Sequence, residues 1–486
     1  MSAENSELGA ATGRAAMWAF ASMMGARLVT LVGLTLLARL LAPREFGLLA
    51  FAMAYIVYVE TIGDLGTGTA LIYWPNRRDD AAQITFLINL SAGVFWCLIT
   101  LVIAPYVADF FNAPHGTAIV RALSVGFLIK FLGNTHDALT RKDLRFQARA
   151  VPEVAMAAVK AGISLLLAWR GFGAWSLVWG HLAGLTASTI LFWTVTPWRP
   201  SWTFPRDLLR PMLAYGRGII FVNILSAVQL QTDLAVVGRM LGMTALGLYQ
   251  LAGKIPEATV TVIVRVASRV LLPAFSRVAA SGTHPKEAYL SAARYIGVVT
   301  LPITTGLAIL ARPFVLALFG PKWVAAAPMV TALTILAGIR ALGAHPGDVL
   351  KATGRVAVVA RIETMRAILI VIAALLAARH SAVAVAIAMA VVDGVAMFFS
   401  FTVSSRAIHV KFSEIARAYL PSIVAAGCMA AALLTWMQWG PKLSPAPAVL
   451  IPVTIGAMVY LAVIAVTDRT LFAEVREVFR LRSRTT

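Results

Sequence analysis

The feature that most constrains this chain is the recurrence, from end to end, of apolar stretches about as long as a bilayer is thick. A helix that crosses the hydrocarbon core needs ~20 mostly apolar residues, and stretches such as 84–104, 173–196 and 447–467 meet that length. The 486 residues are 59% hydrophobic and 13% charged, with a mean hydropathy of +0.81. No soluble core can hide that much apolar surface, so the composition excludes a soluble enzyme, a disordered protein and a secreted disulfide scaffold.

These stretches predict an all-α polytopic membrane protein with about 14 transmembrane helices. The expected spans are 13–38, 46–72, 84–104, 117–138, 150–169, 173–196, 213–238, 245–273, 290–310, 325–349, 356–378, 381–404, 416–437 and 447–467.

The basic residues between these spans indicate an orientation. Most of them lie in even-numbered connections, for example Arg141, Lys142, Arg145 and Arg149. Because cytoplasmic loops carry an excess of lysine and arginine, we expect both termini in the cytoplasm, which agrees with an even number of spans. The net charge of +20 is then explained by cytoplasmic loops that face anionic lipid, so the expected partner is membrane lipid and not nucleic acid.

An internal repeat predicts the domain organisation. Residues 39–52 and 239–252, displaced by 200 positions (239 − 39), share Arg39 with Arg239 and Gly47 with Gly247. An even number of spans separates them, so we expect two parallel six-helix lobes followed by two C-terminal helices. The expected parts are a cytoplasmic tail 1–12, an N-lobe 13–196, a cytoplasmic inter-lobe linker 197–212, a C-lobe 213–404, the last two spans with the preceding loop 405–467, and a cytoplasmic amphipathic tail 468–486.

Charged residues inside the expected spans are the candidate site, because each costs ~2.5–3.5 kcal/mol to insert and is retained for a function or a partner. Cations that suit an anionic ligand, most simply phosphate or pyrophosphate, are Arg27, Lys160, Lys254, Arg265 and Arg340, with Lys130 a further intramembrane charge. Carboxylates that balance them or bind a coupling ion are Glu60, Asp64 and Asp233. Amides that suit a sugar are Asn223 and Gln229.

Simple pairing is the alternative for these residues. Arg27 would pair with Asp64, and Lys254 with Asp233 or Glu257, while the amides would bond between helices. The chain has neither a GxxxxGK[ST] phosphate loop nor a HExxH motif, and Cys97 and Cys428 lie inside apolar stretches. We therefore expect no catalytic residue, no metal and no cofactor, and the chain is not expected to be an enzyme.

Several ordered motifs resemble the polysaccharide transporter family, the Wzx-type oligosaccharide flippases of the MOP superfamily. The motifs are ARLLAPREFGLLAFA at 38–52, GDLGTGTALI at 63–72, ALTRKDLRFQARAVPE at 138–153, GFGAWSLVWG at 171–180, QTDLAVVGRMLGMTALGLYQLAGK at 231–254, LLPAFSRV at 271–278, LFGPKW at 318–323 and LKATGR at 350–355. Their order and spacing extend over most of the chain.

The resemblance implies a MATE-like fold in the bacterial inner membrane, with two lobes around a central cavity. It implies a flippase that moves undecaprenyl-pyrophosphate-linked oligosaccharide repeat units from the cytoplasmic to the periplasmic leaflet by alternating access. The polymer would be exopolysaccharide, capsule or O-antigen. A polymerase and export complex are further partners that it implies, and H⁺ or Na⁺ is the expected coupling ion.

Three other functions remain open at this point. A cation-coupled multidrug antiporter of the same superfamily would have acidic residues dominating its cavity. A membrane glycan polymerase would carry its catalytic residues on a sizeable outer loop, and the expected outer loops are short. A scaffolding subunit of an export complex would transport nothing by itself.

Overall fold

The computed structural model describes residue 25 and the ranges 29–74, 76–201, 203–280, 285–441, 444 and 447–468. Side chains at 146, 263–270, 272–274 and 279–280 are outside the description. Within the described ranges the chain is helical and has no strand. Among the same residues, 11 helices are long and apolar enough to cross a membrane. The prediction of an all-α, multi-pass membrane protein is therefore confirmed.

The count of about 14 spans is consistent with these helices and stays a prediction. Most of the first expected span lies outside the described residues, which include its end as a helix over Val29–Leu40. The seventh and eighth expected spans are counted together as Arg206–Val262. The eleventh forms the helix α13 (Val356–Ala377), which carries Arg361, Glu363 and Arg366. The predicted tails 1–12 and 468–486 lie outside the described residues, except for Asp468.

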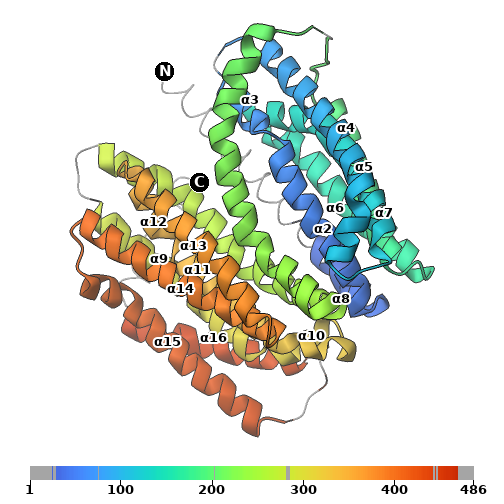
Figure 1. Ribbon diagram of the computed structural model, residues 1–486. Helices are drawn as coiled ribbons and strands as arrows, with labels where there is room; N and C mark the ends of the chain where they lie inside the picture. The colour runs from blue at the N-terminus through green and yellow to red at the C-terminus, as the bar shows by residue number, and fades with distance from the viewer. Residues whose placement is uncertain are drawn as a thin grey trace, which may run out of the picture. The chain divides into compact units, whose positions relative to one another are not determined.

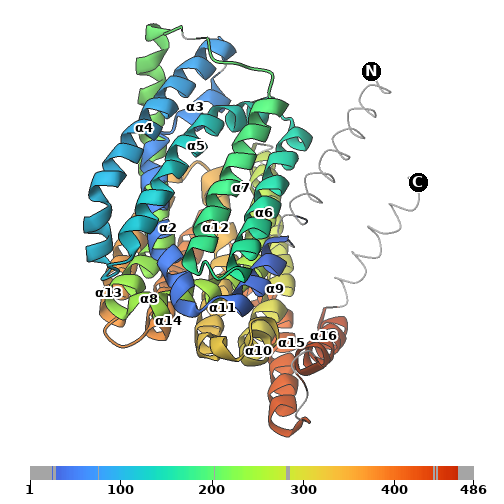
Figure 2. The ribbon, with the colours of Figure 1, turned by 90° about the vertical axis from the view of Figure 1, so that its right-hand side faces the viewer.

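The chain forms two compact units, residues 1–250 and 251–486. The first contains the helix over Val29–Leu40, α2 (Pro43–Gly63), α3 (Thr67–Tyr73), α4 (Arg78–Phe110), α5 (Gly116–Lys142), α6 (Phe146–Trp169), α7 (Ala174–Val195) and the first part of α8 (Arg206–Ala280). Its most extensive packing joins α4 to α5 and α6 to α7, and both views of the ribbon show these pairs side by side (Figure 1, Figure 2).

The second unit contains the end of α8 and the remaining helices. These are α9 (Lys286–Ile309), α10 (Ala311–Leu318), the 3₁₀ helix η1 (Pro321–Ala326), α11 (Ala327–Leu342), α12 (Ala344–Ala352), α13, α14 (Ala382–Ala407), α15 (Phe412–Trp439) and α16 (Pro447–Thr467). Here α14 packs on α11 and α13, while α15 packs on α9 and α16.

Left-handed backbone conformations divide two of the long apolar segments. The expected span 46–72 is two helices, because Leu65 (φ 48°) and Gly66 (φ 68°) interrupt it between α2 and α3. Gly242 (φ 82°) interrupts α8, and the chain turns there (Figure 1). Such conformations favour glycine because a Cβ atom clashes in them. The separation of the expected spans 213–238 and 245–273 is thus confirmed.

A second repeated turn supports the predicted parallel repeat. Leu144 (φ 53°) and Gly354 (φ 78°) follow α5 and α12, respectively, in the left-handed conformation. The next residues, Arg145 and Arg355, each donate their backbone N–H to the carbonyl five residues earlier at 2.9 Å. Each residue of the second turn lies 210 positions after its counterpart in the first (354 − 144 and 355 − 145). The helices α5, α6 and α7 therefore correspond, in order, to α11 with α12, α13 and α14.

The segment predicted as an inter-lobe linker, 197–212, is anchored to the first unit. Trp198 is 9% exposed and lies in a hydrophobic core with Leu208 and Met212, which belong to the first turns of α8. The backbone N–H of Ser201 donates to Gln83 of α4 at 3.0 Å. The boundary between the lobes stays a prediction.

Prolines inside two helices leave carbonyl oxygens that side chains of neighbouring helices satisfy. Pro105 cannot donate to the carbonyl of Leu101, and Arg121 of α5 donates to that oxygen at 3.1 Å. In the second unit, Pro302 of α9 likewise releases the carbonyl of Val298, which accepts from the hydroxyl of Tyr460 at 2.9 Å. These bonds hold α4 to α5 and α9 to α16 where an unpaired carbonyl in lipid would be costly.

Candidate functional site

The first unit contains a polar cluster inside its spans, centred on Lys130 of α5. Its ammonium group donates to the carboxylate of Glu60 on α2 at 2.6 Å. The Glu60 side chain is only 16% exposed and that of Lys130 is 37% exposed. Lys130 also acts electrostatically on Asp64 and on His181. Two helices are thus joined by an ion pair whose cation remains partly accessible.

Asp64 is held at the turn between α2 and α3. It is the C-cap residue of α2, and its carboxylate accepts a hydrogen bond from the backbone N–H of Gly68 in the first turn of α3. The N-terminal end of a helix favours a negative charge. Lys130 and Arg141 are the cations that act on it. Its predicted partner, Arg27, lies outside the described residues.

Lys160 lies at a close approach of α6 and α7. A Cβ atom at Gly184 would come within 2.7 Å of the carbonyl oxygen of Met156 and 2.9 Å of the Lys160 Cβ, and one at Gly180 would come within 1.9 Å of the Ser164 hydroxyl oxygen. Small residues four apart let membrane helices approach in this way. The close packing brings Lys160 into the electrostatic surroundings of His181, which is 9% exposed.

Asp233 lies in the first part of α8, on the outer side of the predicted orientation. Its carboxylate accepts a hydrogen bond from the Tyr249 hydroxyl at 3.0 Å and one from the backbone N–H of Leu234 at 2.8 Å. It also acts electrostatically on Tyr58, whose hydroxyl is hydrogen-bonded to Thr232. A carboxylate is therefore surrounded by hydroxyl groups from α2 and α8.

The second unit has its own buried ion network. Asp393 of α14, whose side chain is 2% exposed, accepts from Arg340 of α11 at 2.5 Å and from Arg366 of α13 at 2.5 Å. Arg366 also pairs with Glu363 at 3.1 Å. Two arginines and two carboxylates thus share one site, and the Arg340 side chain remains 30% exposed.

Lys130 and Arg340 occupy repeat-related positions. They differ by 210 residues (340 − 130), the displacement that relates the turns at Leu144 and Gly354. Each is a partly exposed cation on the fourth expected span of its half, and each is paired with a carboxylate on another helix. The fifth span of each half carries a further cation, Lys160 or Arg366.

The remaining candidates are distributed as follows. Lys254 pairs with Glu257 at 2.8 Å, so one of the two pairings considered from the sequence is confirmed. The side chain of Arg265 lies outside the described residues. Asn223 and Gln229 are half-buried on the first part of α8. Their roles in binding a substrate stay predictions.

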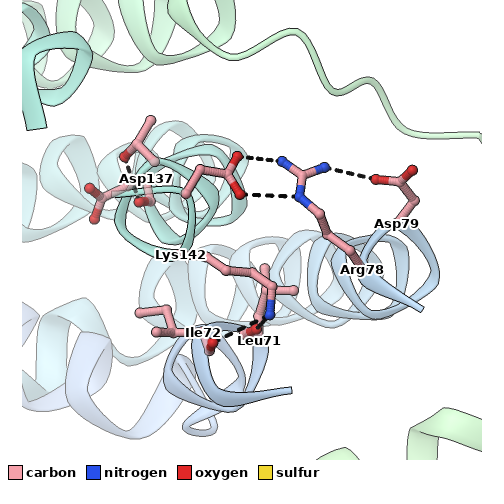
Figure 3. A network of polar contacts seen from close by, with 8 residues as sticks. Leu71, Ile72, Arg78, Asp79, Asp137 and Lys142 are labelled. Carbon is pink, nitrogen blue, oxygen red and sulfur yellow. Dashed lines mark hydrogen bonds and ion pairs between the residues drawn. The ribbon is translucent and has the colours of Figure 1, made fainter. Parts of the chain in front are cut away.

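A network of polar contacts joins helix ends of the first unit on the side that the predicted orientation places in the cytoplasm. Lys142 donates to the carbonyl oxygens of Leu71 at 2.9 Å and Ile72 at 3.3 Å (Figure 3). It also donates to the Trp74 carbonyl at 2.5 Å, and this C-terminal end of α3 is a place where a cation is favoured. Arg78 lies between two carboxylates, bonding to Asp79 at 2.9 Å and to Asp143 at 2.6 Å (Figure 3).

A second set of ion pairs includes the start of α8. Arg77 pairs with Asp207 and with Asp80, and hydrogen bonds to these two carboxylates raise the pKa of its guanidinium. Asp137 pairs with Arg141 and with Arg149, the latter at 2.8 Å. Several basic residues that the sequence assigned to anionic lipid therefore also join helix ends within the protein.

Sequence reasoning left Lys130, His181 and Arg366 out of the candidate site. Lys130 was visible as an intramembrane charge, but nothing in its own span indicated that Glu60 would face it. The histidine and Arg366 lack any motif. The repeat at a displacement of 210 is a signal that would have selected Lys130 as the counterpart of Arg340.

Residues 36–328, more than half of the chain, match the family described as Polysaccharide biosynthesis protein. The chain belongs to this family. The resemblance to polysaccharide transporters inferred from the sequence motifs is thereby confirmed.

Curated proteins similar to this chain include relatives from Bacillus subtilis and Rhizobium meliloti. Teichuronic acid biosynthesis protein TuaB of Bacillus subtilis is 26% identical over 70% of this chain and 71% of its own length. Succinoglycan biosynthesis transport protein ExoT of Rhizobium meliloti is 26% identical over 66% of this chain and 65% of its own length. This chain therefore spans about two thirds of the length of such relatives.

Solved structures extend the likeness of the fold. The lipid II flippase MurJ in an inward closed conformation has a TM-score of 0.79 at 12% identity, and the match covers 94% of this chain and all of MurJ. An inward-facing multidrug resistance MATE family transporter of the MOP superfamily has a TM-score of 0.65 at 14% identity and covers 79% of this chain and 94% of its own. The MATE-like fold expected from the sequence is confirmed.

Proposed function

We propose that this protein moves a lipid-linked oligosaccharide, carried on undecaprenyl pyrophosphate, from the cytoplasmic to the periplasmic leaflet of a bacterial inner membrane. It would do so by alternating access, with both termini in the cytoplasm. The observation that carries the proposal is the occurrence, at repeat-related positions inside the spans, of two carboxylate-paired but accessible cations, Lys130 and Arg340. Membership of the family, with a relative named as a succinoglycan transport protein, supports it.

The charge pairs suit an anionic head group that has to enter the protein. A diphosphate is strongly attracted to lysine and arginine in surroundings of low dielectric, and arginine binds it with two hydrogen bonds. Each pair is neutral when the site is empty, which avoids an isolated charge in the membrane. In the first unit, a phosphate group would replace Glu60 beside Lys130. In the second unit, a phosphate group would share Arg340 with Asp393.

The other sequence candidates extend the proposed site. Arg27, Lys160, Lys254 and Arg265 would add positive charge for the diphosphate. Asn223 and Gln229 would bond to sugar hydroxyls. These roles rest on residue type and on position in the spans.

We assign the coupling ion, H⁺ or Na⁺, to the carboxylates. Asp233 accepts hydrogen bonds from the Tyr249 hydroxyl and from a backbone amide. The hydrogen-bonded hydroxyl groups of Tyr58 and Thr232 lie in its electrostatic surroundings. A second candidate site for the ion is formed by Asp64 at the α2–α3 turn and Glu60. Lys130 acts electrostatically on Asp64 and forms an ion pair with Glu60. A polymerase and an export complex would receive the transported unit.

The experiment is to delete the gene in its host and locate the lipid-linked oligosaccharide. Spheroplasts are treated with a glycosidase or lectin that cannot cross the membrane, before and after permeabilisation. We expect surface polymer to be lost and the glycosylated carrier to react only after permeabilisation, with both defects reversed by the native gene. A strain lacking the polymerase is the matched comparison, because its carrier reaches the outer leaflet. The same outer-leaflet result in the deletion strain would contradict a flippase.

A further inference from the structure

The contact between α2 and the segment of α8 that follows Gly242 depends on two glycines. A Cβ atom built on Gly247 would lie 1.8 Å from the carbonyl oxygen of Pro43. One built on Gly47 would lie 1.8 Å from the carbonyl oxygen of Met243. Backbone atoms, and not the ends of flexible side chains, occupy both places. No residue larger than glycine fits either position without separating the two segments.

The contact is reciprocal with respect to the internal repeat. Gly47 and Gly247 are related by 200 positions, and so are Pro43 and Met243 (247 − 47 and 243 − 43). Each glycine therefore meets the carbonyl of the residue four positions before its own counterpart. Two copies of the same turn face each other in this way when a pseudo-twofold axis passes between them, as between the halves of a parallel repeat.

The outer end of the first part of α8 is joined to α4 as well. Phe111 lies 3.1 Å from a Cβ built on Gly238, the guanidinium of Arg239 lies 5.3 Å from the centre of the Phe110 ring, and Asn112 donates to the Arg239 carbonyl at 3.4 Å. Gly242, with its left-handed backbone, lies between this contact and the one at Gly247. The turn at Gly242, whose backbone conformation glycine permits, thus connects the part of α8 that contacts α4 with the part that contacts α2.

We propose that the Gly47–Gly247 contact is the closing contact at the outer end of the transporter, and that it separates when the substrate site opens outward. This rests on the proposed alternating access and orientation. Close backbone packing gains van der Waals contact without side-chain bonds of its own, so the two turns can separate and meet again in each cycle. A methyl group at either position opposes the closed state, while the open state tolerates it.

The test measures a distance across the contact in the purified full chain. Spin labels are attached at Arg44→Cys and Thr244→Cys, two exposed repeat-related positions beside the glycines, after Cys97→Ala and Cys428→Ser. The protein is placed in lipid nanodiscs and the distance distribution is recorded by pulsed electron resonance. With native glycines we expect a short and a long distance. Gly247→Ala or Gly47→Ala should raise the ratio of long to short by about tenfold.

Gly218→Ala is the matched control, because it lies on α8 and an added Cβ there has nothing within 4 Å. It should leave the ratio unchanged. A single short distance that Gly247→Ala does not alter would overturn the proposal, and so would an equal effect of Gly218→Ala. If the alanine variants do not accumulate, a single distance with native glycines would itself overturn it.

The distance measurement is independent of the proposed substrate. If the deletion experiment contradicts a flippase but the distances still shift, the closing contact would stand and the transporter would carry another substrate. Confirmation of flipping with one fixed distance would remove the contact from the mechanism and leave the function intact.

Discussion

Lys130 and Glu60 show what a charged residue costs and contributes inside a membrane. Each charge alone costs a few kcal/mol to insert, and the ion pair at 2.6 Å offsets part of that cost. Removing one partner of a fully buried pair leaves the other uncompensated, which typically costs about 3–5 kcal/mol. The cost here is smaller, because the Lys130 side chain is 37% exposed and solvent screens part of the charge. A simple loss of activity in Lys130→Ala would therefore not distinguish substrate binding from loss of the fold.

A pair of variants separates these roles. Lys130→Ala should lower both the amount of protein in the membrane and polysaccharide export. Adding Glu60→Gln removes the unpaired carboxylate, so we expect the protein level to recover. Export should stay about tenfold or more below that of the Glu60→Gln single variant, which lacks the same carboxylate, because the cation for the diphosphate is missing. Immunoblots of membranes and assays of surface polymer measure the two quantities.

The matched control is the double variant Lys286→Gln with Glu414→Gln. This ion pair, at 2.7 Å, joins the starts of α9 and α15 and includes none of the candidate residues, so its loss should leave export unchanged. Recovery of export together with protein in the Lys130 and Glu60 double variant would assign Lys130 to charge pairing alone.

At the scale of helices, packing depends on groups that the helices cannot satisfy within themselves. Pro302 leaves the Val298 carbonyl of α9 without its normal donor, and the Tyr460 hydroxyl of α16 supplies one. The close approach of α6 and α7 depends instead on missing side chains at Gly180 and Gly184. In lipid, where no hydrophobic effect drives helices together, such hydrogen bonds and close contacts decide which helices pair.

A double-mutant cycle tests whether the Tyr460 hydroxyl stabilises the protein by bonding the carbonyl that Pro302 leaves without a donor. Tyr460→Phe should lower the free energy of unfolding by about 0.6–1.7 kcal/mol in the native chain. In a Pro302→Ala background the effect should shrink, since the new N–H at position 302 bonds the Val298 carbonyl. Unfolding in mixed micelles with increasing dodecyl sulfate measures both values.

Tyr106→Phe serves as the control, because Tyr106 is 72% exposed. It should change the free energy of unfolding little. Equal losses from Tyr460→Phe in both backgrounds would show that the hydroxyl acts on something other than the orphaned carbonyl.

At the scale of the whole molecule, the net charge of +20 is distributed unevenly over the connections. Several basic residues are also used in ion pairs, such as Arg78 with Asp143 and Arg77 with Asp207. Orientation is set during insertion, before those pairs form, so the excess of lysine and arginine still predicts cytoplasmic termini.

Reporter fusions test this orientation. Green fluorescent protein joined after Thr486 should fluoresce, and alkaline phosphatase joined there should be inactive. Alkaline phosphatase joined after Gly440, between α15 and α16, should be active because that connection is expected on the outer side. The reverse pattern would place the termini outside and would contradict the positive-inside argument.

The sequence by itself determined that this protein is a bundle of membrane helices with an internal parallel repeat, because span length, hydropathy and charge bias are local properties of the chain. It also indicated the charged residues in the spans, since each is costly there. Only the tertiary structure decided which of them meet. Glu60 and Lys130 lie 70 positions apart, Arg340 and Asp393 lie 53 apart, and no local pattern specifies which faces of their helices pack. The reciprocal contact of Gly47 with Gly247 is likewise a tertiary property, because the repeat supplies two equal turns but only folding brings them together.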